Sequence, residues 1–192
     1  MAEDVTFTLP EIARRLDVPQ HRLIHLCEKG VVVPEVHDAE GRGSSRVFSA
    51  RNLLELAVAV RLRDMMLPVA AVGAIIHVLR AFETRLRQEI GDFSLADSSR
   101  GEAAPELTVI IGDGRELFFS LGGHGRKARM FGGVPLDAVN GGLNGWDGRI
   151  DPIPMLTGGS RDEVRVGGPE GSHYGRVELS VTAVAQSLDF SK

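Results

Sequence analysis

A predicted helix over residues 19–29 carries side chains that can hydrogen-bond to the edges of DNA bases. Gln20, His21 and Arg22 lie in its first turn, and His25 follows one turn later. Arginine pairs bidentately with guanine and glutamine with adenine, and helices that enter a major groove present their first residues to the bases. We therefore expect a DNA-recognition helix here. The alternative is a solvated first turn that contacts no ligand.

A second candidate site is a predicted β-hairpin over residues 35–48. Its tip contains Gly41 and Gly43, and small residues let a backbone approach phosphate groups closely. Arginine adds a charge-assisted fork for phosphate, and serine hydroxyls can donate to phosphate oxygens. The alternative is an ordinary surface hairpin. The predicted DNA contacts of this hairpin are Arg42, Ser44, Ser45 and Arg46.

Arginines on the neighbouring helices are further candidates for phosphate contacts. Arg14 and Arg15 fall on the first predicted helix, and Arg61 and Arg63 fall on the third. Either pair is equally consistent with a solvated helix face, because long charged side chains are mostly exposed.

The helices that must position these residues have clear start and stop signals. Thr8 and Glu11 have the spacing of a capping box at the start of the first helix. Asp17-Val18-Pro19 ends that helix after little more than two turns, and Gly30 ends the second. Two short helices joined by a tight turn form a helix-turn-helix unit, and the hairpin after it would be its wing.

Two longer helices follow. Ser49 is the predicted N-cap of a helix from Ala50 to about Met66, whose apolar residues require burial on most sides. A helix over residues 68–90 carries an apolar seam at heptad-like spacing, with a strongly charged outer half from Arg80 onward. Such a seam indicates a partner helix in a second copy. The predicted dimerisation residues are Val72, Ile75, Ile76, Leu79, Phe82, Leu86 and Ile90.

The C-terminal half has the pattern of strands and turns. Apolar runs on either side of Gly112-Asp113-Gly114 predict a hairpin, and residues 176–183 alternate as a strand with one buried face does. The glycine-rich stretch 122–175 between them indicates either short strands with tight turns or one long loop. We therefore predict a small, mostly β domain.

The predicted fold class is α+β, with four parts in chain order. They are a winged helix-turn-helix DNA-binding domain (5–67), an amphipathic dimerisation helix (68–90), a linker (91–105) and a glycine-rich β domain (106–192).

Charge and cysteine content restrict the function classes. The net charge of the 192 residues is −4, with zero on residues 1–90 and −4 on residues 91–192, so DNA binding is permitted but not required. Cys27 is the only cysteine, which excludes an internal disulfide and a cysteine-based zinc cluster. At an apolar helical position it favours a small buried side chain over a redox sensor. With neither a secretory signal nor an apolar run of about 20 residues, we expect a cytoplasmic protein without membrane contact.

Catalytic motifs are absent from the C-terminal half of the sequence. It contains neither a phosphate-binding Gly-x-x-x-x-Gly-Lys-Ser/Thr loop nor a Gly-x-Ser-x-Gly nucleophile elbow. A ligand-sized cavity lined by His124, Trp146 or His173 would favour an enzyme. The spacing of His124 and His173 from the nearby aspartates does not support a cation site. We predict that the protein is not an enzyme and has no catalytic residues, metal site or cofactor.

Three motifs in order resemble the MerR family of bacterial transcription regulators. They are Leu9–Leu16 (LPEIARRL), Glu28–Pro34 (EKGVVVP) and Gly43–Leu53 (GSSRVFSARNL), within a matching stretch from about Phe7 to Ile90. The chain departs from the family pattern at Ile24–Cys27, where Arg-Tyr-Tyr-Glu is usual, and at Ser45, where tyrosine is usual.

The resemblance implies a homodimeric transcription regulator that binds a pseudo-palindromic double-stranded promoter at the nucleoid. RNA polymerase or another protein is then a further expected partner, and the β domain is an effector or interaction domain of unknown role. The alternative is a DNA-anchoring or accessory protein whose β domain binds another protein rather than a small ligand.

Overall fold

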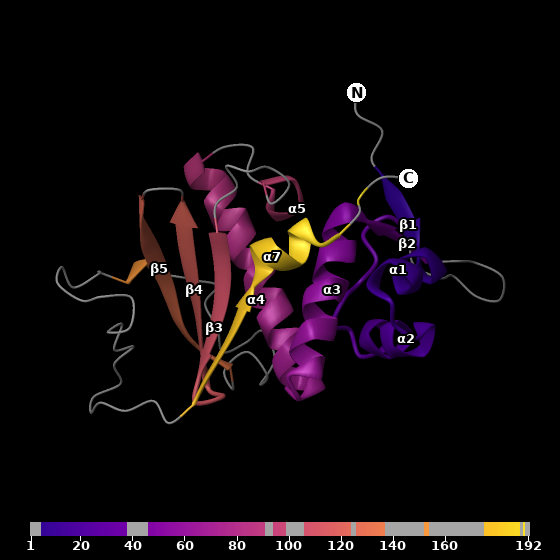
Figure 1. Ribbon diagram of the computed structural model, residues 1–192, viewed down its shortest axis with the longest axis horizontal. Coiled ribbons are helices and arrows are strands. Elements are labelled where there is room, and N and C mark those ends of the chain that lie inside the picture. The colour runs from indigo at the N-terminus through magenta and orange to yellow at the C-terminus, as the bar shows by residue number, and fades with distance from the viewer. Residues whose placement is uncertain are drawn as a thin grey trace. The chain divides into compact units, whose positions relative to one another are not determined.

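The computed structural model describes residues 5–37, 46–90, 94–98, 106–123, 126–136, 152–153, 175–188 and 190. The chain divides into two units, one formed by Met1–Glu102 with Thr182–Lys192 and the other by Ala103–Val181. The second unit is therefore inserted between two segments of the first. The elements of both are labelled in Figure 1. The fold is mixed α+β, with a helical N-terminal region followed by antiparallel strands.

The first unit begins with a short strand and two short helices. Strand β1 (Thr6–Thr8) leads directly into α1 (Leu9–Leu16), and α2 (Gln20–Glu28) follows after a tight turn. The Glu11 carboxylate accepts hydrogen bonds from the Thr8 amide at 2.7 Å and the Thr8 hydroxyl at 2.8 Å. Asp17, in the left-handed conformation with φ 52°, turns the chain between the helices. The predicted helix-turn-helix is thus confirmed.

A small sheet connects the start of the unit with its third helix. Strand β2 (Val47–Ser49) pairs antiparallel with β1, so that Phe7 lies opposite Phe48 and both side chains are buried. Strand β1 was not predicted, because three residues are too few for an alternating pattern to be recognised. This pairing ties the end of the wing to the start of α1.

Helix α3 (Ala50–Asp64) is the centre of the first unit. The Asn52 amide donates to the Ser49 hydroxyl oxygen at 3.1 Å, which confirms Ser49 as the N-cap. Residues 52–60 are all buried, as the apolar composition predicts, but they include two polar side chains, Asn52 and Glu55.

Helix α4 (Val69–Ile90) has its apolar seam inside the single chain. Six of the seven predicted dimerisation residues are at most 2% exposed, and the side chain of Ile90 lies outside the described residues. Among the described side chains, the seam is therefore buried within the single chain. The spacing of the apolar residues in α4 is typical of a helix buried in one chain as well as of a coiled coil. The six buried residues are Val72, Ile75, Ile76, Leu79, Phe82 and Leu86.

The segment predicted as a linker contains a helix. Helix α5 (Leu95–Ser98) buries Leu95 and Ala96 and belongs to the first unit, which extends to Glu102. A single helical turn with two apolar residues is too short to be distinguished from a polar linker by periodicity.

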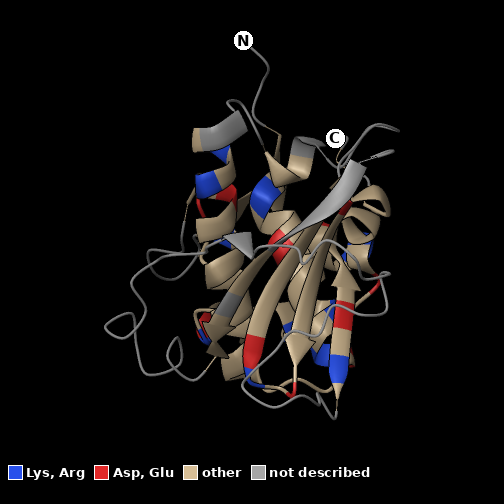
Figure 2. Cartoon of the chain, turned by 90° about the vertical axis from the view of Figure 1, so that its left-hand side faces the viewer, with Lys and Arg blue, Asp and Glu red and all other residues tan. Residues whose placement is uncertain are grey.

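The second unit is a five-stranded antiparallel sheet in the order β6-β5-β4-β3-β7. The strands are β3 (Glu106–Gly112), β4 (Glu116–Gly123), β5 (Arg126–Pro135), β6 (Pro152–Ile153) and β7 (Arg176–Ser180). The predicted hairpin is confirmed, with Gly112 opposite Glu116. Val109, Phe119 and Phe131 are aligned across three strands and are fully buried. Glu106 and Glu116 are the first residues of their strands, which leaves the centres of β3 and β4 uncharged (Figure 2).

The last described segment returns to the first unit. Strand β7 ends at Ser180, and α7 (Val181–Gln186) begins at the next residue, where the alternation had predicted that the strand continues to Ala183. The buried residues Val181, Val184 and Ala185 have helical rather than alternating spacing. Thr182–Lys192 are grouped with the first unit, whereas the predicted β domain extends to residue 192.

Among the described residues, no helix is both long and apolar enough to cross a membrane.

Candidate nucleic-acid interface

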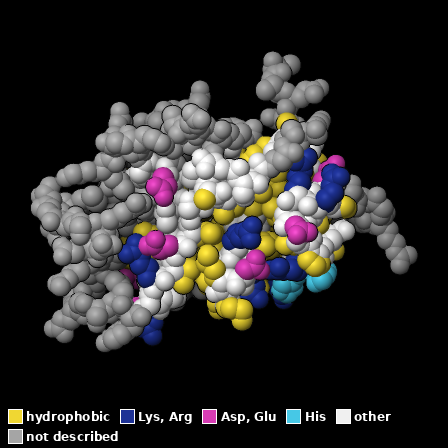
Figure 3. Space-filling model, in the orientation of Figure 1, with side chains coloured by type: hydrophobic (Ala, Val, Ile, Leu, Met, Phe, Trp, Pro, Cys, Tyr) yellow, Lys and Arg dark blue, Asp and Glu magenta, His cyan; other side chains and the backbone are white. Residues whose placement is uncertain are grey.

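Helix α2 turns one face into the protein and the other outward. Leu23 and Leu26 are at most 3% exposed, whereas Gln20, His21 and His25 are exposed. On a helical wheel the two histidines lie opposite the leucines, because residues four positions apart share a face. Figure 3 shows histidine side chains together on the surface over α2, with lysine or arginine side chains next to them. Three of the four predicted base contacts on α2 are thus available to a ligand.

The fourth, Arg22, is partly engaged within the protein. It lies at the edge of the outward face, and its Nη2 is 2.6 Å from Oδ1 of Asp64, the last residue of α3. Both side chains are partly exposed, at 36% for Arg22 and 45% for Asp64. The ion pair holds the first turn of α2 against the end of α3, and an exposed pair of this kind opens at small cost.

The arginines of α1 and α3 lie in different surroundings. Arg14 and Arg61 are exposed. Arg15 is half-buried, with its guanidinium carbon 4.9 Å from the centre of the Phe7 ring, a cation–π distance. Arg15 therefore helps to pack β1 onto α1. The sequence alone indicates only a phosphate contact or a solvated face for this arginine.

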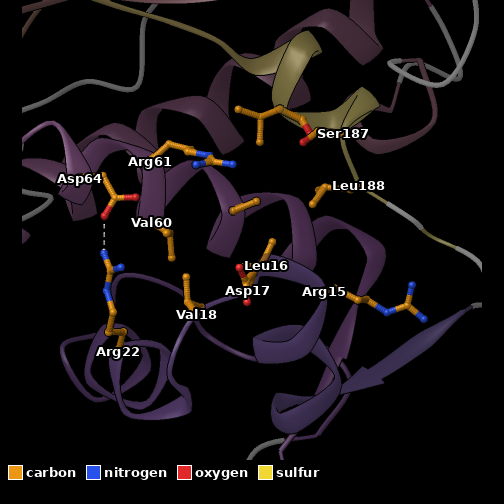
Figure 4. A pocket seen from close by; sticks show the side chains of 12 residues that line it. Arg15, Leu16, Asp17, Val18, Arg22, Val60, Arg61, Asp64, Ser187 and Leu188 are labelled. Atoms are coloured by element: carbon orange, nitrogen blue, oxygen red, sulfur yellow. Dashed lines mark hydrogen bonds and ion pairs between the residues drawn. The ribbon is translucent and has the colours of Figure 1, made fainter.

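A pocket of about 380 Å³ lies within the first unit, beside Arg22. It is formed by the end of α1, the start of α2, one side of α3 and the C-terminal segment. In Figure 4 the Arg61 side chain extends between α3 and the segment that carries Ser187, whereas Arg15 points away from the pocket. The lining residues are Arg15, Leu16, Asp17, Val18, Arg22, Ala57, Val60, Arg61, Asp64, Val184, Ser187 and Leu188.

The wing is described only at its base. His37 and Val47 form an antiparallel bridge with two backbone hydrogen bonds of 3.2 and 2.9 Å, and Arg46 is half-buried beside it. This bridge is where a hairpin over residues 35–48 would close. The predicted tip contacts Arg42, Ser44 and Ser45 lie outside the described residues.

Polar contacts hold the base of the wing to α3. One carboxylate oxygen of Glu35 accepts from the Ser49 hydroxyl at 2.6 Å, and the other accepts from Arg51 at 3.1 Å. The Glu35 amide donates to the Asn52 side-chain oxygen at 2.8 Å. Burial opposes ionisation of Glu35, but the hydrogen bond from Ser49 and the charge of Arg51 outweigh it and lower its pKa. Glu35 is therefore ionised at neutral pH.

Two buried glutamates form ion pairs between α3 and α4. Glu55 is 3% exposed and accepts from Nε and Nη2 of Arg80, both at 2.5 Å. Burial raises the pKa of Glu55 despite this arginine. Glu83 is 2% exposed and pairs with Arg51 at 3.0 Å and Arg87 at 3.3 Å.

Sequence reasoning missed this network. In the sequence, the outer half of α4 is recognisable only as strongly charged, whereas Glu83 is among the most buried side chains of the helix. The available signals were a single acid inside the apolar run of α3 and the (i, i+4) pair of Glu83 and Arg87.

No group of three or more His, Cys, Asp or Glu side chains that could hold a metal ion occurs among the described residues. The thiol of Cys27 is half-buried on α2.

Comparison with known proteins identifies the N-terminal region. Residues 7–85 match the model of the MerR HTH family regulatory proteins, a span that begins in β1 and ends within α4. The N-terminal domain is therefore a MerR-family helix-turn-helix domain, and the rest of the chain is not covered by the match. No curated protein and no solved structure matches the chain.

Proposed function

We propose that this chain, whose N-terminal domain is of the MerR family, is a transcription regulator that docks α2 and the wing on promoter DNA. The observation that carries the proposal is the outward face of α2, where Gln20, His21 and His25 are exposed. Recognition helices of this kind present such residues to base edges, while the wing contacts the phosphate backbone.

The proposed contacts differ in what they contribute. Gln20 and His21 are base-reading residues, with His25 one turn further along the helix. Arg46, together with Arg42, Ser44 and Ser45 of the wing, contacts phosphates. Arg14 and Arg61 are proposed as further phosphate contacts because both are exposed. Arg15 and Arg22 contribute less, because Phe7 and Asp64 already engage their guanidinium groups.

A binding titration with DNA from upstream of the gene tests this assignment. His21→Ala is expected to lose about 1–3 kcal/mol on the specific site and little on unrelated DNA. Arg46→Ala is expected to weaken both and to reduce the salt dependence by about one counterion. Arg176→Ala, an exposed arginine of the second unit, is the control. Unchanged affinity in both His21→Ala and Arg46→Ala would exclude this surface.

The assembly on DNA is proposed to be a homodimer on a pseudo-palindromic site, as the family layout implies. Because the α4 seam is buried within one chain, the dimer contact would have to use another surface or follow a rearrangement of α4. Light scattering of the protein with and without operator DNA measures this. A single chain bound per operator would contradict the dimer.

RNA polymerase, or another protein, is the proposed second partner at the promoter, with the sheet of the second unit as an effector or interaction domain. Retention of polymerase on promoter DNA with and without the full chain tests this partner. Equal retention would argue for the accessory role instead.

A further inference from the structure

The base of the wing is held by side chains of the first turn of α3 as well as by its own backbone. Glu35 lies two residues before His37, at which the described part of the wing ends. Its carboxylate binds the Ser49 hydroxyl and Arg51, and its amide binds Asn52. The side-chain amide of Asn52 also donates to the Val33 carbonyl at 3.1 Å. The direction in which the chain enters the wing therefore depends on α3.

Arg51 extends this attachment to α4. Its Nη1 is 3.1 Å from Oε1 of Glu35, and its Nε is 3.0 Å from Oε2 of Glu83. One planar guanidinium thus serves two carboxylates from different elements, which a lysine ammonium cannot do in the same fixed geometry. Glu83 is 2% exposed, so the position of its side chain depends on the packing around α4 and little on solvent.

Glu83 continues the chain of contacts to α5. Its Oε1 accepts from the Leu95 amide at 3.1 Å and from Arg87 at 3.3 Å. The contacts Glu35–Arg51–Glu83–Leu95 therefore run from the base of the wing, through α3 and α4, to the first residue of α5. Without Arg51 this route is broken between α3 and α4.

We propose that Arg51 is a positioning residue for DNA binding, which fixes the angle of the wing by joining Glu35 to Glu83. Arg51 contacts no DNA in this scheme and acts through the wing alone. Through the contacts Glu35–Arg51–Glu83–Leu95, a displacement of α4 or α5 would also move the base of the wing. These two helices precede the second unit in the chain. This inference rests on the proposed DNA-binding function.

The test compares Arg51→Gln with Arg87→Gln. Both arginines pair with Glu83, but only Arg51 also pairs with Glu35, so Arg87→Gln removes the same charge and leaves the wing contact intact. Arg51→Gln is expected to weaken specific DNA binding about tenfold, and Arg87→Gln about twofold at most. Arg51→Lys should restore only part of the loss. Equal effects of Arg51→Gln and Arg87→Gln would overturn the proposal.

Coupling to the wing distinguishes positioning from a general loss of structure. If Arg51 acts through the wing, Arg51→Gln should add little to the loss already caused by Arg46→Ala, whereas its effect should add fully to that of His21→Ala. Full additivity with both variants would overturn the proposal. If Arg51→Gln lowers the melting temperature, Glu35→Gln tests the same Glu35–Arg51 contact from the wing side. In that variant the ion pair between Arg51 and Glu83 remains. The outcome for Glu35→Gln must be the same: little addition to Arg46→Ala, full addition to His21→Ala.

The failure of this inference can be told apart from failure of the proposed function. If Arg46→Ala and His21→Ala themselves leave DNA binding unchanged, the DNA-binding surface is wrong. If they weaken binding but Arg51→Gln and Glu35→Gln do not, only the positioning role is wrong.

Discussion

Arg22 and Asp64 join the first turn of α2 to the last residue of α3, with 2.6 Å between Nη2 and Oδ1. Arg22 can reach a base edge or a phosphate only by leaving this carboxylate. In the proposed complex the acid would therefore compete with DNA for the arginine, and its own charge would repel the phosphate backbone. Because both side chains are partly exposed, the pair can open at small cost when another anion approaches Arg22.

Asp64→Asn should strengthen DNA binding. The substitution releases Arg22 and removes one negative charge near the proposed interface, so we expect a gain of about threefold to tenfold at low salt, smaller at high salt. Stability should change by less than about 1 kcal/mol, because both partners are partly exposed. Anisotropy titrations at several salt concentrations measure the effect. Glu178→Gln, which removes the same charge from β7 in the other unit, should not reproduce it.

Removal of Arg80 should destabilise the first unit. Glu55 is 3% exposed and receives both of its short bonds from Arg80, so Arg80→Ala leaves a buried carboxylate with Asn52 as its remaining donor. We expect a loss of about 2–4 kcal/mol in the free energy of unfolding, measured by urea denaturation.

Two further variants check this reason. Arg87→Ala leaves Glu83 with Arg51 and the Leu95 amide, and should cost about 1 kcal/mol or less. Adding Glu55→Gln to Arg80→Ala should recover part of the stability, because the uncompensated charge is gone. A double variant less stable than Arg80→Ala alone would argue against this explanation.

The capping box of α1 predicts a pH effect. Hydrogen bonds from the Thr8 amide and then the Thr8 hydroxyl hold the pKa of Glu11 below its ordinary value of 4.5. The unfolded chain therefore takes up this proton at a higher pH than the folded chain. The stabilisation by ionised Glu11 is complete above the unfolded pKa and is lost as the pH falls through the folded pKa.

Glu11→Gln should consequently lower the melting temperature at pH 7, and the difference from the original protein should shrink as the pH falls below about 4.5. Thr8→Val keeps the amide donor, which is the larger cause of the shift, so its pH dependence should persist. A difference for Glu11→Gln that is constant between pH 7 and pH 3 would rule out the cap as its origin.

Gly132 is required by the geometry of the sheet. Its φ is +129°, and a Cβ there would lie 2.6 Å from the Leu117 carbonyl oxygen and 2.8 Å from Cα of Phe118. Backbone atoms cannot move aside as a flexible side chain can, so Gly132→Ala should cost about 2–4 kcal/mol. Gly175→Ala has no atom within 4 Å of the new Cβ and should be close to neutral. Chemical denaturation of the two variants provides the comparison.

Sequence cues were reliable where the structure is decided locally. The capping residues Thr8 and Ser49, the turn at Asp17 and the hairpin at Asp113 each depend on neighbours within four residues. The exposure of Gln20, His21 and His25 followed from the opposite placement of Leu23 and Leu26 on the same helix. These features made the helix-turn-helix predictable.

Features decided by distant contacts could not be predicted in this way. Glu83 is buried because Arg51 and the Leu95 amide meet it from other elements. Arg22 is engaged by a residue 42 positions away. For the seam of α4, periodicity shows that a face is buried but not what buries it. The strand predicted over residues 176–183 ends at Ser180, and the buried residues of α7 that follow have helical spacing.

Phe190 should be important for the stability of the first unit, although it is remote in sequence from the N-terminal part of that unit. It is 7% exposed and belongs to the segment that returns to this unit. Phe190→Ala should cost about 3 kcal/mol, whereas Gln186→Ala, at an exposed position, should cost less than about 0.5 kcal/mol. Labelling of Cys27, the only cysteine, reports opening of α2 and should accelerate in Phe190→Ala alone. Equal labelling rates in the two variants would show that the segment does not support α2.

The discontinuous first unit also has a consequence for synthesis on the ribosome. Domains usually fold in the order in which they emerge, the N-terminal one first. Here the strands of the inserted unit are translated before Val184 and Phe190, the buried residues that complete the helical unit. In a nascent chain the strands of the sheet are thus complete first, and the packing of Val184 and Phe190 into the helical unit can form only after translation has passed Phe190.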